Sequence, residues 1–357
     1  MALKGAVLSF PHLGDYHVPI AYFAKRLLNM KVIKPLPITK KTLEIGAKYS
    51  PDSVCVPFKY NLGNFIESLD QGASVLIQAG GGCRFGYYAE VQEQILRDLG
   101  YKFTFIRIVS NDKLTVTNIY RQLKQINPRL NFFLFIYYFY FIIRMSKSLE
   151  NIQQYVNKNS GFEVEKGSFG LLYNKFLGEI ELVNNIGELN RLFLRYQRAF
   201  NKLPINKPVD CLKVGIVGEV YVAIEPFSNC YVESQMAKKG VEVTRLVTAT
   251  RILLRRPKDH RDLLVKAHPY LKYAIGADGT DSVAKTKVFA EEGYDGVIHI
   301  KPFACIPELN AMPMLQKISH DYNMPILYLS FDAQTSEAGV LTRLEAFYDM
   351  LLMKRGH

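Results

Sequence analysis

Residues 73–90 read ASVLIQAGGGCRFGYYAE, and this stretch decides the fold. A strand-like run, 73–78, leads into a glycine-rich turn, and a helix-like run, 87–99, leaves it. Such a turn lets backbone approach a ligand closely and aims helix N–H groups at negative charge. It holds Cys83 where a phosphate-binding loop has lysine, and it matches neither the Walker nor the dinucleotide pattern. A thiolate is therefore the expected chemistry at this turn.

Two other cysteines share a local design. Each reads Cys-x-Pro at the start of an apolar-periodic segment, Cys55 with Pro57 and Cys305 with Pro307. Proline is favoured at the start of a helix because its missing N–H is no loss there. Each cysteine is thus predicted just outside a helix N-terminus, where the helix dipole favours anions. Three such thiols suggest one shared ligand, and an iron–sulfur cluster is the leading candidate.

Length and composition bound the class of protein. The 357 residues suggest two domains or one large one, and 48% apolar with 22% charged residues is ordinary for a soluble globular protein. Residues 1–10 read as a strand rather than a signal peptide, so a cytoplasmic location is expected. In a reducing compartment, five cysteines favour metal or redox roles over disulfides. Cys211 is expected to be a small buried hydrophobe, and Cys230 either that or a fourth ligand.

The net charge is +12, and the positive residues are spread along the chain. One denser basic region, 251–272, indicates a solvated face or a surface for an acidic partner or a phosphorylated substrate. The sequence shows no motif typical of DNA or RNA binding, so nucleic acid is not an expected partner.

Strand-like and helix-like runs alternate over residues 1–130 and again over 209–357, which predicts a parallel sheet in each part. The predicted fold class is therefore α/β, with two flavodoxin/Rossmann-like parallel-sheet domains and a helical connector, 131–208, between them. Thr39 and Asp281 are expected helix caps. Residues 132–143 are all apolar or aromatic, fewer than the about 20 that a membrane span needs. They predict a buried or interface helix rather than membrane association.

The topology also places the cysteines. In open parallel sheets, ligands bind beyond the carboxyl ends of the strands. Cys83 and Cys305 both follow strands, in different domains, and Cys55 reaches the same level if residues 53–54 end a strand. We therefore expect Cys55, Cys83 and Cys305 to meet in a cleft between the two domains.

Eight short stretches carry a resemblance to a known family, and they span nearly the whole chain outside the connector. They are KKTLE (40–44), YSP (49–51), CVPFK (55–59), GCRFGYY (82–88), GIVGE (215–219), PFACIPE (302–308), EAG (337–339) and TRLEAF (342–347). Together they resemble the 2-hydroxyacyl-CoA dehydratase D-component superfamily, in particular its CoA-protein-activase-like or dehydratase-like branch.

The resemblance implies paired α/β domains around a [4Fe-4S] cluster that Cys55, Cys83 and Cys305 hold, with one iron open for water or a substrate oxygen. It implies an ATP-dependent activator, a separate protein, as the electron donor, and a CoA thioester or another small molecule as the substrate. A second dehydratase-like subunit, or a second copy of this chain, is the other expected partner. The sequence has no nucleotide-phosphate motif, which is consistent with a recipient of electrons rather than an ATPase.

Four further residues are candidates for catalysis. Lys59, Arg84 and Tyr87 lie within four residues of Cys55 or Cys83, where they would bond substrate or cluster, or cap and pack helices. Glu219 lies in a strand-exit loop, as Asp332 and Glu337 do, and would serve acid–base chemistry, cap a helix or form a salt bridge.

Two functions stay open. One is low-potential reduction or dehydration with electrons from the activator, and the other is a non-catalytic electron-transfer or scaffold protein that carries the cluster. Zinc on the same thiols is less favoured, because structural zinc sites use close C-x-x-C pairs.

Overall fold

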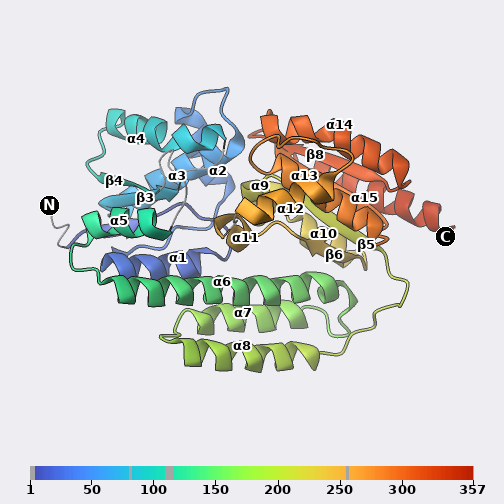
Figure 1. Ribbon diagram of the computed structural model, residues 1–357, viewed down its shortest axis with the longest axis horizontal. Coiled ribbons are helices and arrows are strands. Elements are labelled where there is room, and N and C mark those ends of the chain that lie inside the picture. The colour runs from blue at the N-terminus through green and yellow to red at the C-terminus, as the bar shows by residue number, and fades with distance from the viewer. Residues whose placement is uncertain (1–4, 80–82, 109–115, 255–256, 357) are drawn as a thin grey trace. The chain divides into compact units, whose positions relative to one another are not determined.

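The computed structural model describes residues 5–79, 83–108, 116–254 and 257–356 (Figure 1). The chain divides into two compact units, Met1–Lys147 and Ser148–His357. Each unit contains one four-stranded, all-parallel sheet with helices on both faces, so the predicted α/β class with two parallel sheets is confirmed. The border falls inside helix α6, within the segment predicted as a connector.

The first sheet has the strand order β2-β1-β3-β4. Leu8 at its centre pairs with Val32 on one side and with Val75 on the other. Short parallel strands joined by helical crossovers are the arrangement that the alternating pattern predicts. The strands are β1 Val7–Ser9, β2 Lys31–Val32, β3 Val75–Ala79 and β4 Thr104–Ile108.

Helices cover both faces of this sheet because strand side chains alternate between them. Val75 and Ile77 pack with Leu8, Leu27 and Phe135 in one apolar core, and Leu76 faces the other side, in a second core formed mainly with α3 and α4. The helices are α1 His17–Phe23, its π-helical continuation η1 Ala24–Leu28, α2 Lys40–Tyr49, α3 Val56–Asp70, η2 Arg84–Tyr87, α4 Tyr88–Asp98 and α5 Val116–Ile126.

Helices α2 and α3 pack backbone against backbone. A Cβ added at Gly46 would lie 1.8 Å from the carbonyl oxygen of Lys59, and one at Gly63 would lie 2.0 Å from that of Thr42. Only glycine permits this approach. Thr39 caps α2 through a reciprocal pair of hydrogen bonds with Thr42, which confirms the predicted cap.

The second sheet has the order β6-β5-β7-β8, and every residue of β7 is buried. A central parallel strand covered on both faces reads as a continuous buried run. Phe289 of α13 packs on Gly215 of β5, where a Cβ would lie 2.4 Å from its ring. The strands are β5 Lys213–Gly218, β6 Glu242–Arg245, β7 Gly296–Pro302 and β8 Ile326–Phe331.

The second unit is rich in helix, and α13 begins at Gly279, two residues before the predicted cap Asp281. Asp281 lies in the first turn of α13 instead, with its carboxylate 3.0 Å from Lys285 Nζ. Helix α6 Phe132–Asn159 is divided between the two units, and the other helices of the second unit are η3 Ser160–Phe162, α7 Ser168–Ile180, α8 Ile186–Asn201, α9 Val220–Ile224, η4 Phe227–Asn229, α10 Val232–Lys238, α11 Ala249–Leu253, α12 Pro257–Ala267, α13 Gly279–Glu291, α14 Ile306–Asp321 and α15 Glu337–Arg355.

The aromatic run 132–143 forms the start of α6, which continues without a break to Asn159. Phe135 and Phe141 are fully buried, whereas Phe133 is 82% exposed. The run is therefore one part of a longer helix with a buried face and an exposed face. By length and composition the helix 132–162 could cross a membrane, and a third of its most apolar window is buried. The run 132–143 is itself shorter than a membrane span, but the helix that contains it is long enough for one.

Candidate functional site

Cys55 is the N-cap residue of α3, as predicted, with extended backbone and Pro57 in the first turn. Residues 52–54 form a turn and bend rather than the end of a strand, so that premise is wrong. The direction of α3 nevertheless brings Cys55 to the expected edge. Ser9 Oγ donates to Ser68 Oγ at 2.9 Å, and His12 N donates to Asn64 Oδ1 at 2.8 Å.

These two contacts orient the helix. The chain from Ser9 to His12 leads past the carboxyl end of β1, and the step from Ser68 back to Asn64 leads toward the start of α3. The N-terminus of α3 therefore points to the carboxyl edge of the first sheet. A helix N-terminus at that edge presents N–H groups and favours negative charge there.

Cys83 follows β3 at the same edge, and its side chain is exposed. Its carbonyl accepts a hydrogen bond from Gly86 N at 3.0 Å and opens the 3-10 turn η2. The N-cap of α4 is Tyr87, so Cys83 lies one turn before the α-helix and not directly at its N-terminus. The glycines 80–82 and the side chain of Arg84 lie outside the described residues.

One contact joins the two cysteine segments of the first unit. Cys55 Sγ lies 3.2 Å from the hydroxyl of Tyr88, a buried residue five positions after Cys83. The ring of Tyr88 packs edge-on against Phe58, with centroids 4.8 Å apart. The structure therefore brings Cys55 and the segment that begins at Cys83 to one edge of one sheet.

Cys305 is the N-cap of α14, as predicted, and comes three residues after the end of β7. Its amide donates to Pro302 O at 3.2 Å, and its carbonyl accepts from Leu309 N at 2.8 Å. Ala304 has φ of +59°, in the left-handed region that a residue with a Cβ adopts at a cost. The turn between strand and helix is therefore tight, and it holds Cys305 at the carboxyl edge of the second sheet.

A buried polar layer that the sequence analysis missed lies behind this turn. His299 Nε2 lies 2.6 Å from Glu308 Oε2, and the two side chains are 0% and 1% exposed. Lys301, two residues along β7, is also buried, and burial lowers its pKa while Cys305 and Glu308 oppose that effect. The sequence did contain a sign of this polar layer, because His299 and Lys301 stand two positions apart in an otherwise apolar strand and so face the same side of the sheet.

Glu219 is the N-cap of α9, and its carboxyl accepts hydrogen bonds from Tyr221 N at 3.0 Å and Val222 N at 2.9 Å. Asp278 Oδ2 accepts from Val220 N at 3.2 Å in the same place. Burial first, and then the charges of Asp278 and Glu308, raise the pKa of Glu219 to about 8. A carboxyl whose pKa is raised this far is suited to donating a proton near neutral pH.

The other predicted residues have these positions. Lys59 lies in the first turns of α3, partly exposed, and Tyr87 is 59% exposed at the start of α4. Asp332 accepts hydrogen bonds from Gln334 N and Thr335 Oγ1 within its own loop, and Glu337 is the first residue of α15.

The surroundings of the two remaining cysteines disfavour the thiolate form. Burial raises the pKa of Cys211, and burial together with the charge of Glu337 raises that of Cys230 to about 11. A thiol must lose its proton to ligate a metal, so these surroundings favour neither as a ligand. Both are disulfide-free, as are the other three cysteines that the structure describes.

Cys55 and Cys83 belong to the first unit and Cys305 to the second, so their meeting at one cluster stays a prediction. Within the described residues, no three His, Cys, Asp or Glu side chains converge as a metal site would require. The chemistry of the three thiols does fit an iron–sulfur cluster, since each lies at the start of a helical segment and at the carboxyl edge of a parallel sheet.

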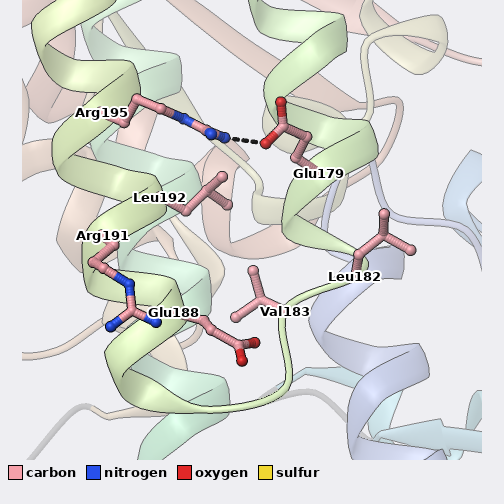
Figure 2. Close-up of a pocket in the computed structure, with 7 residues that line it drawn as sticks. All are labelled: Glu179, Leu182, Val183, Glu188, Arg191, Leu192 and Arg195. Carbon is pink, nitrogen blue, oxygen red and sulfur yellow. Dashed lines mark hydrogen bonds and ion pairs between the residues drawn. The ribbon is translucent and has the colours of Figure 1, made fainter.

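A separate surface hollow of about 390 Å³ lies on the α7–α8 hairpin (Figure 2). Arg195 forms an ion pair with Glu179 across it, and the buried Val183 and the exposed Leu182 also line it. Its lining contains no cysteine and none of the predicted site residues. This hollow is therefore distinct from the cysteine-bearing edges.

No family model matches this sequence, and no curated protein matches it.

Proposed function

We propose that this chain is an iron–sulfur protein of the dehydratase-like or reductase-like kind, in which Cys55, Cys83 and Cys305 hold a [4Fe-4S] cluster. An ATP-dependent activator protein would supply its electrons, for low-potential reduction or dehydration of a CoA thioester or another small molecule. The observation that carries the proposal is the shared placement of the three thiols, each between a carboxyl edge and a helical start. When bound, such a cluster supplies one-electron transfer and a Lewis-acidic iron.

The chain's own residues would then divide the remaining work. Glu219, whose pKa is raised to about 8, would donate a proton to a leaving oxygen of the substrate. Tyr88 would orient the Cys55 sulfur through its hydroxyl. Lys59, Arg84 and Tyr87 would bind polar or anionic groups of the substrate. A second dehydratase-like subunit or a second copy of this chain would complete the assembly, in the cytoplasm.

Iron and sulfide analysis after anaerobic purification or reconstitution tests this proposal. We expect ~4 iron atoms per chain and an electron paramagnetic resonance signal after reduction. Cys83→Ala, Cys55→Ala and Cys305→Ala should each lose the signal. Cys211→Ala is the matched control and should keep it, because burial raises the pKa of that thiol and disfavours the thiolate that a cluster needs. A colourless, iron-free wild-type protein with intact thiols after reconstitution would overturn the proposal.

A second candidate function is an electron carrier or scaffold without catalysis. The exposed face of α6 favours it, because Phe133 at 82% exposure is the kind of side chain that a protein partner covers. Assays of 2-hydroxyacyl-CoA thioesters with an activator and reductant separate the two functions. Turnover would establish the enzyme, and a loaded cluster that is reduced by the activator without turnover of any thioester would favour the carrier.

A further inference from the structure

The buried pair His299–Glu308 joins two elements that flank the Cys305 turn. His299 lies on β7, the strand that leads into the turn, and Glu308 is the third residue of α14, the helix that leaves it. Their side chains meet at 2.6 Å with essentially no exposure to solvent. The pair therefore closes a loop of ten residues with Cys305 inside it.

The direction of the Glu308 side chain is unusual for its position. A glutamate three residues after an N-cap commonly turns back to the N-cap amide. Here that amide donates to Pro302 O, and the Glu308 carboxylate points inward to His299. The first turn of α14 is thereby tied to the sheet through a side chain as well as through the backbone.

A second, independent contact holds the same helical turn. A Cβ added at Gly279 would lie 2.4 Å from the carbonyl oxygen of Pro307, so the start of α13 packs directly against the residue before Glu308. Tyr328 of β8 lies opposite His299 in the sheet and packs edge-on against its ring at 5.5 Å. The pair is thus enclosed by α13, α14 and two strands.

Stability alone does not account for this pair. His299 Nδ1, Glu308 Oε1 and the Tyr328 hydroxyl are buried and lack hydrogen-bond partners among the described residues. Buried pairs of this kind can usually be replaced by apolar side chains with no loss of stability, whereas unpaired buried polar atoms cost free energy. The His299–Glu308 pair costs free energy and lies beside Cys305, the candidate cluster ligand. This combination indicates a role in function.

We propose that Glu308 is the positioning residue for Cys305: through its hydrogen bond to His299 it fixes the first turn of α14 and so the direction of the Cys305 sulfur. The inference rests on the proposed function, because the direction of the Cys305 sulfur matters only if Cys305 is a cluster ligand. Glu308 acts through the turn and does not itself touch the cluster or the substrate.

Alkylation of the full-length apoprotein tests the positioning directly. The protein is treated with iodoacetamide, and modification of Cys305 relative to the exposed Cys83 is measured by peptide mass spectrometry. Glu308→Ala should raise this ratio about tenfold, the effect expected when one buried hydrogen bond between ionisable side chains is lost. Glu308→Gln should raise it less than about twofold, because the amide oxygen can still accept from His299.

A double variant, His299→Leu with Glu308→Met, covers the case in which Glu308→Ala does not fold. Apolar replacement of both partners should preserve the unfolding midpoint while releasing the turn, so the ratio should again rise. An unchanged ratio in the folded double variant would overturn the proposal. Equal increases for Glu308→Ala and Glu308→Gln would also overturn it, since they would assign the effect to charge and not to the hydrogen bond.

Iron analysis of the same variants separates this inference from the proposed function. If wild-type protein binds no iron and the alkylation ratio still responds, the positioning stands and the cluster proposal fails. If the wild type binds iron and the ratio does not respond, the positioning fails alone. If both hold, Glu308→Ala should lower the iron content and shift the reduction potential, and Glu308→Gln should restore both.

Discussion

Replacement of Glu219 by glutamine should remove a large pH dependence from the stability of the second unit. In the folded chain, burial and the charges of Asp278 and Glu308 raise the pKa of this carboxyl from 4.5 to about 8. In the unfolded chain the carboxyl is in water and titrates near its ordinary pKa. Glutamine has nearly the same shape but does not ionise, so it isolates this one titration.

The sign follows from which state holds the proton. Between pH 4.5 and about 8 the folded state keeps the proton and the unfolded state releases it, so the free energy of unfolding falls as pH rises through this window. The pKa difference sets a ceiling of about 5 kcal/mol for the loss. Because Glu219 is partly exposed and water screens its charge, we expect about 2 to 3 kcal/mol.

Urea unfolding at pH 5 and pH 9 measures the effect. The wild-type protein should lose about 2 to 3 kcal/mol more than Glu219→Gln does between the two pH values. Glu44→Gln on α2, where the carboxylate is exposed, is the control and should behave as the wild type. Equal pH dependence in wild type and Glu219→Gln would refute the reasoning, and with it the role of Glu219 as a proton donor at neutral pH.

Four further substitutions test the packing around the cysteine-bearing edges and the α7–α8 hairpin. Gly46→Ala should destabilise the protein by about 3 kcal/mol in urea unfolding, because the added Cβ would lie 1.8 Å from a backbone oxygen. Gly178→Ala is the control: its Cβ would meet open space, and the protein should gain about 0.5 to 1 kcal/mol. Similar effects at the two sites would contradict the close contact of α2 with α3. Tyr88→Phe removes the hydroxyl 3.2 Å from Cys55 Sγ and should cost about 1 kcal/mol while speeding alkylation of Cys55; an unchanged alkylation rate would show that the hydroxyl does not hold the thiol. Arg195→Ala breaks an exposed ion pair with Glu179 and should cost less than about 1 kcal/mol, so a larger loss in thermal unfolding would show that the hairpin depends on this pair.

Much of the fold was predictable because it depends on local chemistry. Strand runs, the Thr39 cap and the helix starts at Cys55 and Cys305 follow from hydrophobic pattern, side-chain hydrogen bonding and the backbone of proline. The start of α13 was less predictable. Its first residue, Gly279, is set by close packing against the carbonyl of Pro307, 28 positions away in the sequence.

The candidate site, like the fold, was only partly predictable from the sequence. The sequence alone determined that Cys55 and Cys305 open helices and that Cys83 and Cys305 follow strands, because each of those features spans only a few consecutive residues. Tertiary structure decided what surrounds them: the Tyr88 hydroxyl on Cys55, the His299–Glu308 pair behind Cys305, and the raised pKa of Glu219. These depend on burial and on charges from distant parts of the chain, which a local pattern does not encode.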